Sequence, residues 1–356
     1  MHRKKIFALF LFILIVFPQS TLKAQEATKL WAFNFTSEIS SQTVYYDQKL
    51  YFTTTDGYVY CLDGNGNLKW KNKTDGSILA SPFLKNKILF IGNQNGTFEA
   101  IDSDYGFLRC KKDLNEKIDK QASFYEGNVY INTSSQSAFS FNAASGQKNW
   151  KRLTNGRILS SPKILNGLLF IPSEEGVLFA VDAKHGPLKW TQNMSFLDNG
   201  SPLMFFKDFL IITSKNNKII SINTTKKSVY WQALVPAKPV SPLLLHNGKL
   251  AFVDYSNSIT CISAANGSLL WRQKFTEIIK DSPISFGLYI LQYSKSGNIY
   301  VLSPSTGKQL LMISLGKNIT SQPLGIENKY LLVPSSGSLS CYQLNFSIKN
   351  TPAITH

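Results

Sequence analysis

Short apolar runs separated by turn signals fill the chain, and residues 161–190 display the pattern most clearly. Four runs rich in Leu, Ile, Val and Phe are divided there by Asn-Gly at 166–167, Glu-Glu-Gly at 174–176 and His-Gly-Pro at 185–187. Runs of about 4–8 such residues, bounded by Gly, Pro and Asn, are typical of β-strands. The stretch therefore predicts a four-stranded antiparallel meander that ends at a tryptophan.

The same unit recurs with a period near 40 residues. Successive gaps between its tryptophans are 39, 40, 40, 40, 41, 40 and 40 residues once Cys110 and Leu311 fill two missing places. The tryptophans are Trp31, Trp70, Trp150, Trp190, Trp231 and Trp271. A glycine precedes the last strand of most units, at Gly66, Gly106, Gly146, Gly186, Gly267 and Gly307, whereas one unit has Lys227 there. Four strands repeated at this period are the signature of a β-propeller blade.

Counting the units predicts how the ring closes. Units begin near residues 40, 80, 120, 160, 200, 240, 280 and 320, and the eighth has only three strands of its own. Residues 29–35, which include Trp31, form a spare strand that can pair with the eighth unit and remove the open sheet edge. We therefore expect an all-β, eight-bladed propeller over residues 25–346, closed by its N-terminal strand and followed by a C-terminal tail at 347–356.

The first 24 residues have the composition of a secretory signal peptide. Arg3, Lys4 and Lys5 precede an apolar run at residues 6–17, which is too short for a transmembrane helix of about 20 residues. An uncleaved N-terminal anchor is the alternative interpretation. We expect a protein exported to the periplasm, associated with the outer membrane or secreted, with no transmembrane segment after cleavage.

The net charge indicates which class of partner to expect, and the spacing of the cysteines indicates their chemical state. The formal charge of +16 becomes +12 when the leader removes four basic residues, so acidic partners at the cell envelope are favoured. Nucleic acid would suit the charge equally well, but an exported protein rarely meets it. The four cysteines, Cys61, Cys110, Cys261 and Cys341, form no CxxC motif, and none follows the leader closely enough to be a lipidation site. We expect Cys61, Cys261 and Cys341 to be buried free thiols, with no disulfide between Cys61 and Cys341.

The residues around each tryptophan resemble the docking motif of the PQQ-like β-propeller repeat family, approximately A-x-D-x-x-T-G-x-x-x-W. Residues 180–190 match it closely, and residues 140–150 and 261–271 match it well. The resemblance covers residues 29–344. It implies that each tryptophan packs between neighbouring blades, so that the six tryptophans and Gly106, Gly146, Gly186, Gly267 and Gly307 are blade-docking residues.

This family includes enzymes and scaffolds. Its quinoprotein dehydrogenases hold a quinone and calcium on the ring axis beneath a disulfide between adjacent cysteines, and they carry long insertions that this chain lacks. The BamB-like branch consists of bare eight-bladed rings that act as binding scaffolds in outer-membrane protein assembly. The resemblance therefore implies a non-catalytic, monomeric interaction scaffold of the cell envelope. A quinoprotein-type enzyme or PQQ-binding protein, and a secreted surface- or glycan-binding propeller, are the alternatives.

Local motifs add no catalytic, cofactor-binding or metal-binding residues. The Asp-Gly-Asn-Gly-Asn run at 63–67 resembles a calcium loop, but Thr74 stands where the acidic twelfth residue belongs. The Ser-x-x-Lys occurrences lack the companion motifs of an acylating serine site. No two of the four histidines have metal-ligand spacing.

The remaining candidate is a basic surface on units 1–3. The loops that link one blade's last strand to the next blade are expected to gather these side chains on one face, where they would contact an acidic protein partner. The alternative is ordinary solvated charge on a basic protein. The candidate residues are Lys71, Lys73, Lys111, Lys112, Lys151, Arg152 and Arg157.

Overall fold

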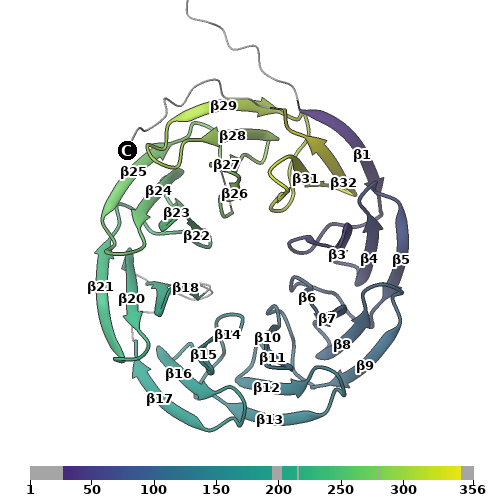
Figure 1. Ribbon diagram of the computed structural model, residues 1–356, viewed down its shortest axis with the longest axis vertical. Helices are drawn as coiled ribbons and strands as arrows, with labels where there is room; N and C mark the ends of the chain where they lie inside the picture. The colour runs from purple at the N-terminus through teal and green to yellow at the C-terminus, as the bar shows by residue number, and fades with distance from the viewer. Residues whose placement is uncertain (1–26, 195–202, 215, 280, 346–356) are drawn as a thin grey trace, which may run out of the picture.

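Eight four-stranded antiparallel sheets surround a central axis like the blades of a propeller (Figure 1). The structure is a computed structural model, and it describes residues 27–194, 203–214, 216–279 and 281–345. The predicted eight-bladed ring is confirmed. The predicted leader at 1–24 and tail at 347–356 lie outside the described residues.

In blades 1–4 the strands follow the chain from the axis outward. They are β2 (Val44–Tyr46), β3 (Lys49–Thr53), β4 (Tyr58–Asp63) and β5 (Leu68–Lys73); β6 (Phe83–Lys85), β7 (Ile88–Gly92), β8 (Thr97–Asp102) and β9 (Leu108–Asp113); β10 (Ser123–Tyr125), β11 (Asn128–Asn132), β12 (Ser137–Asn142) and β13 (Lys148–Leu153); and β14 (Lys163–Leu165), β15 (Leu168–Pro172), β16 (Val177–Asp182) and β17 (Leu188–Asn193).

Blades 5–7 repeat this order. They contain β18 (Met204–Phe206), β19 (Phe209–Thr213), β20 (Lys218–Asn223) and β21 (Ser228–Leu234); β22 (Leu244–His246), β23 (Lys249–Asp254), β24 (Ser258–Ser263) and β25 (Leu269–Lys274); and β26 (Ile284–Phe286), β27 (Tyr289–Tyr293), β28 (Asn298–Leu302) and β29 (Gln309–Ser314).

Blade 8 is completed from the other end of the chain. Its own strands are β30 (Leu324–Ile326), β31 (Tyr330–Ser335) and β32 (Ser338–Gln343), and its outer strand is β1 (Thr28–Asn34). In the antiparallel pairing of β1 with β32, Trp31 lies opposite Cys341. Figure 1 shows β1 beside β32, so the N-terminal strand closes the ring as predicted.

The hydrophobic core lies in layers between blades. In β15, Leu169, Phe170 and Ile171 are all fully buried, because the second strand of a blade has a neighbouring blade on each face. One cluster joins Phe170 and Leu178 of blade 4 to Leu210 of blade 5. The outer strands alternate between exposed and half-buried residues, as β17 does, since only one set of their side chains faces the next blade.

Candidate functional site

Five of the tryptophans connect their blade to the next through one repeated hydrogen bond. The indole Nε1 donates to a backbone carbonyl 33 residues further along the chain, which belongs to the turn before the outer strand of the following blade. These bonds run from Trp31 to Gly64 (3.0 Å), Trp70 to Ser103 (3.0 Å), Trp150 to Ala183 (3.0 Å), Trp231 to Ala264 (3.3 Å) and Trp271 to Pro304 (2.8 Å).

Glycine allows each indole to approach the next blade closely. A Cβ atom on Gly186, whose φ is +89°, would lie 2.8 Å from Cγ of Trp150. Gly66, Gly106, Gly267 and Gly307 lie in the same way against Trp31, Trp70, Trp231 and Trp271. Gly146 instead meets the sulfur of Cys110, the residue that replaces tryptophan in blade 2. These contacts explain why the motif combines a tryptophan with a glycine in the following blade.

The other sequence candidates are explained by local structure. The carboxylate of Asp63 accepts bonds from the backbone N–H groups of Asn65 and Asn67, so the calcium-like run is a capped turn between β4 and β5. All four cysteines are free thiols, and Cys61, Cys261 and Cys341 are buried as expected. Among the described residues, no group of three or more His, Cys, Asp or Glu side chains could hold a metal ion.

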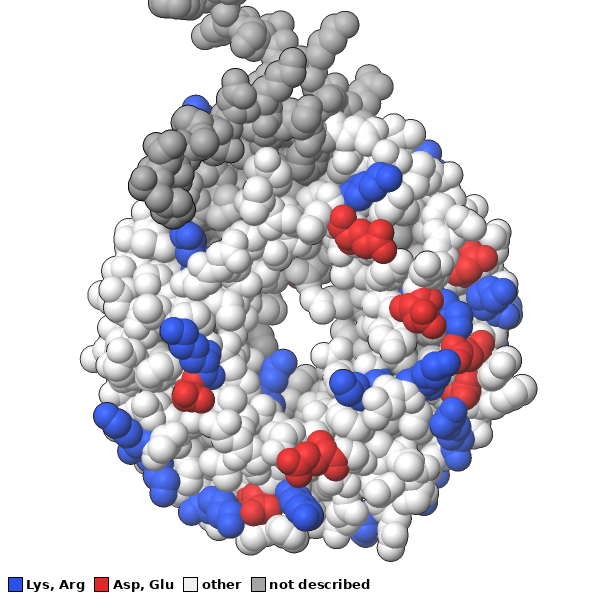
Figure 2. Space-filling model, viewed as in Figure 1, with Lys and Arg blue, Asp and Glu red and all other residues white. Residues whose placement is uncertain are grey.

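The seven basic residues do not form the loop cluster that the sequence predicts. Six of them lie on outer strands: two each on β5, β9 and β13, while only Arg157 lies in a connecting loop. The expectation was wrong about their location because the outer strands extend further along the repeat than assumed. Figure 2 shows Lys and Arg side chains interspersed with Asp and Glu around the rim of the face it displays.

Most of these basic residues have partners within the blades. Lys111 Nζ lies 3.1 Å from a carboxylate oxygen of Asp75 and 3.6 Å from one of Glu99, and Lys151 Nζ lies 3.0 Å from Glu116. Glu99 is 7% exposed, and burial raises the pKa of its carboxyl group. The paired lysines therefore offset carboxylates of their own blades and contribute little net charge to a partner surface.

The remaining basic residues contact aromatic rings, backbone carbonyls or a pocket. Lys73 Nζ lies 4.3 Å and Lys71 Nζ 5.5 Å from the ring centroid of Tyr58. Arg152 donates to the Gly186 carbonyl (3.3 Å), and Arg157 donates to the Ser134 carbonyl (3.4 Å). Lys112 lines a shallow pocket between β9 and β13.

An exposed apolar patch lies at blades 6 and 7, and the sequence interpretation missed it. Tyr255, Ile278 and Val240 are 79%, 65% and 50% exposed, and all three line one pocket of about 480 Å³. Asp254, Asn257, Ile279 and Asp281 complete the lining. We call the three exposed side chains the blade 6 patch.

Comparison of the blades shows that two residues of this patch are apolar or aromatic where other blades have polar residues. At six blade junctions, a backbone N–H in the turn between the second and third strands donates to a carbonyl of the loop that enters the blade. The donors are Thr55, Gln94, Ser134, Glu174, Tyr255 and Lys295, and the acceptors are Glu38, Ser77, Lys117, Arg157, Lys238 and Ile278. Tyr255 and Ile278 are the two members without a short polar or charged side chain. Aligning the repeats at these positions would have revealed the patch from sequence.

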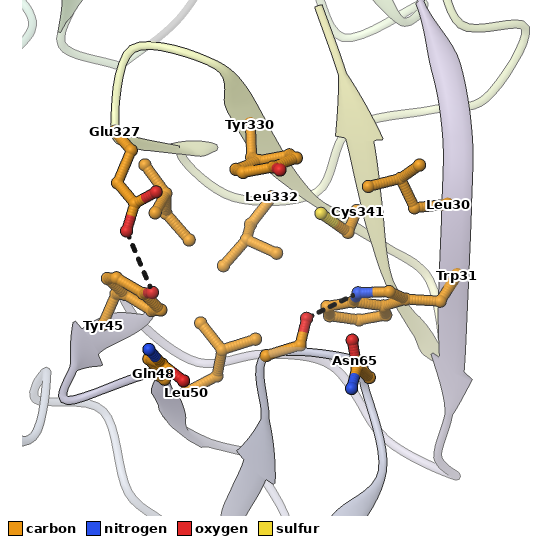
Figure 3. Close-up of a pocket in the computed structure, with 12 residues that line it drawn as sticks. Leu30, Trp31, Tyr45, Gln48, Leu50, Asn65, Glu327, Tyr330, Leu332 and Cys341 are labelled. Atoms are coloured by element: carbon orange, nitrogen blue, oxygen red, sulfur yellow. Dashed lines mark hydrogen bonds between the residues drawn. The ribbon is translucent and has the colours of Figure 1, made fainter.

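A pocket of about 530 Å³ opens at the closing junction, between blade 8 and blade 1 (Figure 3). Its lining comes from the strands and turns of both blades and from β1: Leu30, Trp31, Tyr45, Gln48, Leu50, Gly64, Asn65, Ile326, Glu327, Tyr330, Leu332 and Cys341. The Tyr45 hydroxyl donates to Glu327 Oε1 at 3.4 Å across the two blades. Burial raises the pKa of Tyr45, and the Glu327 carboxylate adds to this shift. We call this space the seam pocket.

Comparison with known protein families gives one match that covers most of the chain. A family profile described as "Outer membrane protein assembly factor BamB" matches residues 20–109, 106–241, 197–318 and 255–346. Outer membrane protein assembly factor BamB of Yersinia pestis is 22% identical over 283 residues, which are 71% of this chain and 70% of that protein. The protein of the same name from Shewanella oneidensis is 22% identical over 293 residues, with 76% and 73% coverage.

Solved structures share the fold at lower identity. BamB from Moraxella catarrhalis superposes with a TM-score of 0.74 at 16% identity, covering 89% of this chain and all of that one. A quinohemoprotein alcohol dehydrogenase from Comamonas testosteroni superposes with a TM-score of 0.76 at 10% identity, covering 93% and 79%. Similarity at this identity establishes the propeller fold and does not distinguish scaffold from enzyme. Among the described residues, no helix is long and apolar enough to cross a membrane.

Proposed function

Because the chain belongs to the family of the outer membrane protein assembly factor BamB, we propose that it is a non-catalytic scaffold of the cell envelope that assists outer-membrane protein assembly. The observation that carries this proposal is the family match, whose overlapping segments run without interruption from residue 20 to residue 346. The blades support it, since their hydrophobic residues and motif residues are used in packing one blade on the next.

Export follows from the same proposal. The leader at residues 1–24 and the charge of +12 on the remaining chain suit a basic protein that meets acidic partners outside the cytoplasm. The partner would be a protein, and the ring would act as a monomer. The seven basic residues stay candidates for part of the contact, with Lys112 the best placed because its neighbours Lys111 and Lys151 are held in ion pairs.

The blade 6 patch is the stronger candidate for the contact surface. Exposed apolar side chains that gather on one surface and are rimmed by polar groups mark protein contact sites. Tyrosine is also enriched at the centres of such contacts. Polar side chains occupy the equivalent positions of other blades, so packing within the propeller does not require Tyr255 or Ile278.

The proposal is tested by changing the patch to the residues of the other blades. In the native organism, Tyr255→Ser combined with Ile278→Ser should reduce crosslinking of the chain to a protein of the outer-membrane assembly machinery. It should also lower the amount of folded outer-membrane β-barrel protein in the envelope. The matched control is Tyr105→Ser, because Tyr105 is similarly exposed (71%) but lies in a turn at the opposite end of a blade.

Two results would contradict the proposal. Deleting the gene without any change in folded outer-membrane protein would remove the assembly role. Saturable binding of the quinone PQQ with calcium, followed by its absorbance, would favour the quinoprotein alternative.

A further inference from the structure

The seam pocket is lined by an aliphatic side chain, Leu332, at a position where half of the blades carry an aromatic ring. Leu332 lies opposite Cys341 in the pairing of β31 with β32. The same pairing position holds an aromatic ring in each of the first four blades: Tyr51, Phe90, Tyr130 and Phe170. Blades 5, 6 and 7 carry Ile211, Ala251 and Leu291 there, so the pocket combines this aliphatic position with features found only at the closing junction.

In blades 1, 3 and 4 the aromatic ring lies beside the docking tryptophan of its own blade. The centroid of Tyr51 is 6.1 Å from that of Trp70, and the centroid of Tyr130 is 6.0 Å from that of Trp150. Trp31 has Leu332 in that place, so one side of its ring faces the pocket while the other lies against Gly66. Figure 3 shows Trp31, Cys341 and Leu332 around this space.

The turn at Glu327 adds the second distinctive feature. The hairpin between the first two strands of blade 8 has three residues in its loop, 327–329, whereas the other seven have two. The longer turn places Glu327 at the pocket, where its carboxylate accepts the bond from Tyr45 of blade 1. In Figure 3 Glu327 and Tyr45 lie on the side of the pocket away from Trp31.

The lining favours a cation. Glu327 is the single charged side chain among the twelve lining residues, although the protein as a whole is strongly basic. Trp31, Tyr45 and Tyr330 supply aromatic rings, which attract cations through their negative faces. Lys329 illustrates this at the same turn, since its Nζ lies 5.1 Å from the centroid of Tyr330, but it does not line the pocket. No lining lysine or arginine is present to hold an anion.

We propose that the seam pocket binds a small organic cation, a quaternary ammonium or a protonated amine. The aromatic rings contact its alkyl groups, Glu327 balances its charge, and Gln48 and Asn65 offer hydrogen bonds to polar substituents. The volume of about 530 Å³ lies in the range of small-molecule sites. This inference is independent of the scaffold role.

The test compares two probes of nearly equal shape. Choline and its neutral isostere 3,3-dimethylbutan-1-ol are titrated into the purified protein by calorimetry, with benzyltrimethylammonium as a larger cation. At least one cation should bind saturably, and the neutral alcohol should bind at least about tenfold more weakly, as expected for the loss of cation–π and ionic attraction. Failure of both cations to bind, or equal binding of choline and the alcohol, would overturn the proposal.

Variants then locate the site. Glu327→Gln should weaken cation binding about tenfold, whereas Glu126→Gln, at the same turn position in blade 3, should leave it unchanged. Leu332→Phe introduces the residue that blades 2 and 4 carry and should abolish binding by filling the pocket. If Leu332→Phe does not fold, as judged by circular dichroism, Glu327→Gln decides alone. Wild-type affinity in Glu327→Gln would place the cation elsewhere and refute the assignment.

Discussion

Gly186→Ala isolates the cost of crowding a docking tryptophan, because the chain contains a control with the same backbone strain. Gly186 and Gly127 have φ values of +89° and +78°, so an alanine Cβ at either position costs about 1–2 kcal/mol in the left-handed region. At Gly127 the new Cβ meets nothing within 4 Å. At Gly186 it lies 2.8, 3.0 and 3.2 Å from three atoms of Trp150.

The difference between the two variants measures the docking contact. Trp150 is only 9% exposed and packs against Tyr130, so its ring has little room to move. Displacing the ring stretches or breaks its bond to Ala183, worth about 0.5–1.5 kcal/mol, and overpacking adds about 1–3 kcal/mol. We expect Gly186→Ala to lower the free energy of unfolding by about 2–4 kcal/mol more than Gly127→Ala.

Urea unfolding followed by far-ultraviolet circular dichroism measures both variants. Repeating the pair in a Trp150→Ala background completes a double-mutant cycle, in which the excess cost of Gly186→Ala should largely disappear. Equal costs for the two alanines in the wild-type background would refute the crowding argument. An excess cost that persists without the indole would show that the turn at Gly186 is strained for another reason.

Two further predictions concern buried titratable groups. Burial alone would raise the pKa of Asp254, but hydrogen bonds from Ser256, Thr260 and Arg272 lower it. The carboxylate therefore stabilises the fold at pH values above its unfolded pKa. This contribution is lost as the pH falls through the folded pKa. Asp254→Asn should therefore cost about 3 kcal/mol at pH 7 and much less near pH 2, measured by urea unfolding at both values. Burial raises the pKa of Cys61, Cys261 and Cys341 to about 11, 12 and 11 from an ordinary 9.0, so their stability is present below pH 9 and is lost at higher pH as the unfolded thiols ionise. The control is a variant with alanine at all three positions, since blades 2 and 4 carry alanine there. Between pH 7 and pH 10 the free energy of unfolding of the wild type should fall by roughly 4 kcal/mol more than that of this variant. Equal losses would contradict the burial argument.

The ring could be predicted from sequence because most blades use the same residues for the same contact. A tryptophan must reach a carbonyl 33 residues further on, so its spacing cannot drift without loss of the docking bond. The closing strand could also be predicted, because Trp31 marks an outer strand at the N-terminal end of the chain, far in sequence from the blade that it completes. Periodicity thus specified both the number of blades and their closure.

The arrangement of the basic residues could not be predicted from sequence, because adjacent residues on a strand point to opposite sides of the sheet. Lys111 lies across the sheet from Glu99 and pairs with it and with Asp75. Lys112 extends instead toward Gly146 of blade 3, with its Cε 3.8 Å from a Cβ built there. Counting charges along the sequence therefore predicted one basic surface, whereas the strand geometry directs neighbouring basic residues to different sides of the sheet. The seam pocket combines the aliphatic Leu332 with one extra turn residue, and a tryptophan count records neither.

The eightfold repeat also separates what folding requires from what it merely tolerates. Polar residues at the positions of Tyr255 and Ile278 in other blades show that a propeller forms without an apolar patch there, and exposed apolar surface carries a risk of aggregation. At the seam, the turn at 327–329 is one residue longer than its seven counterparts, and the pocket beside it leaves space unfilled, which costs stability. Both departures therefore run against stability or solubility, as functional surfaces commonly do. The cation site and the partner surface are accordingly assigned to the places where this chain departs from its own repeat.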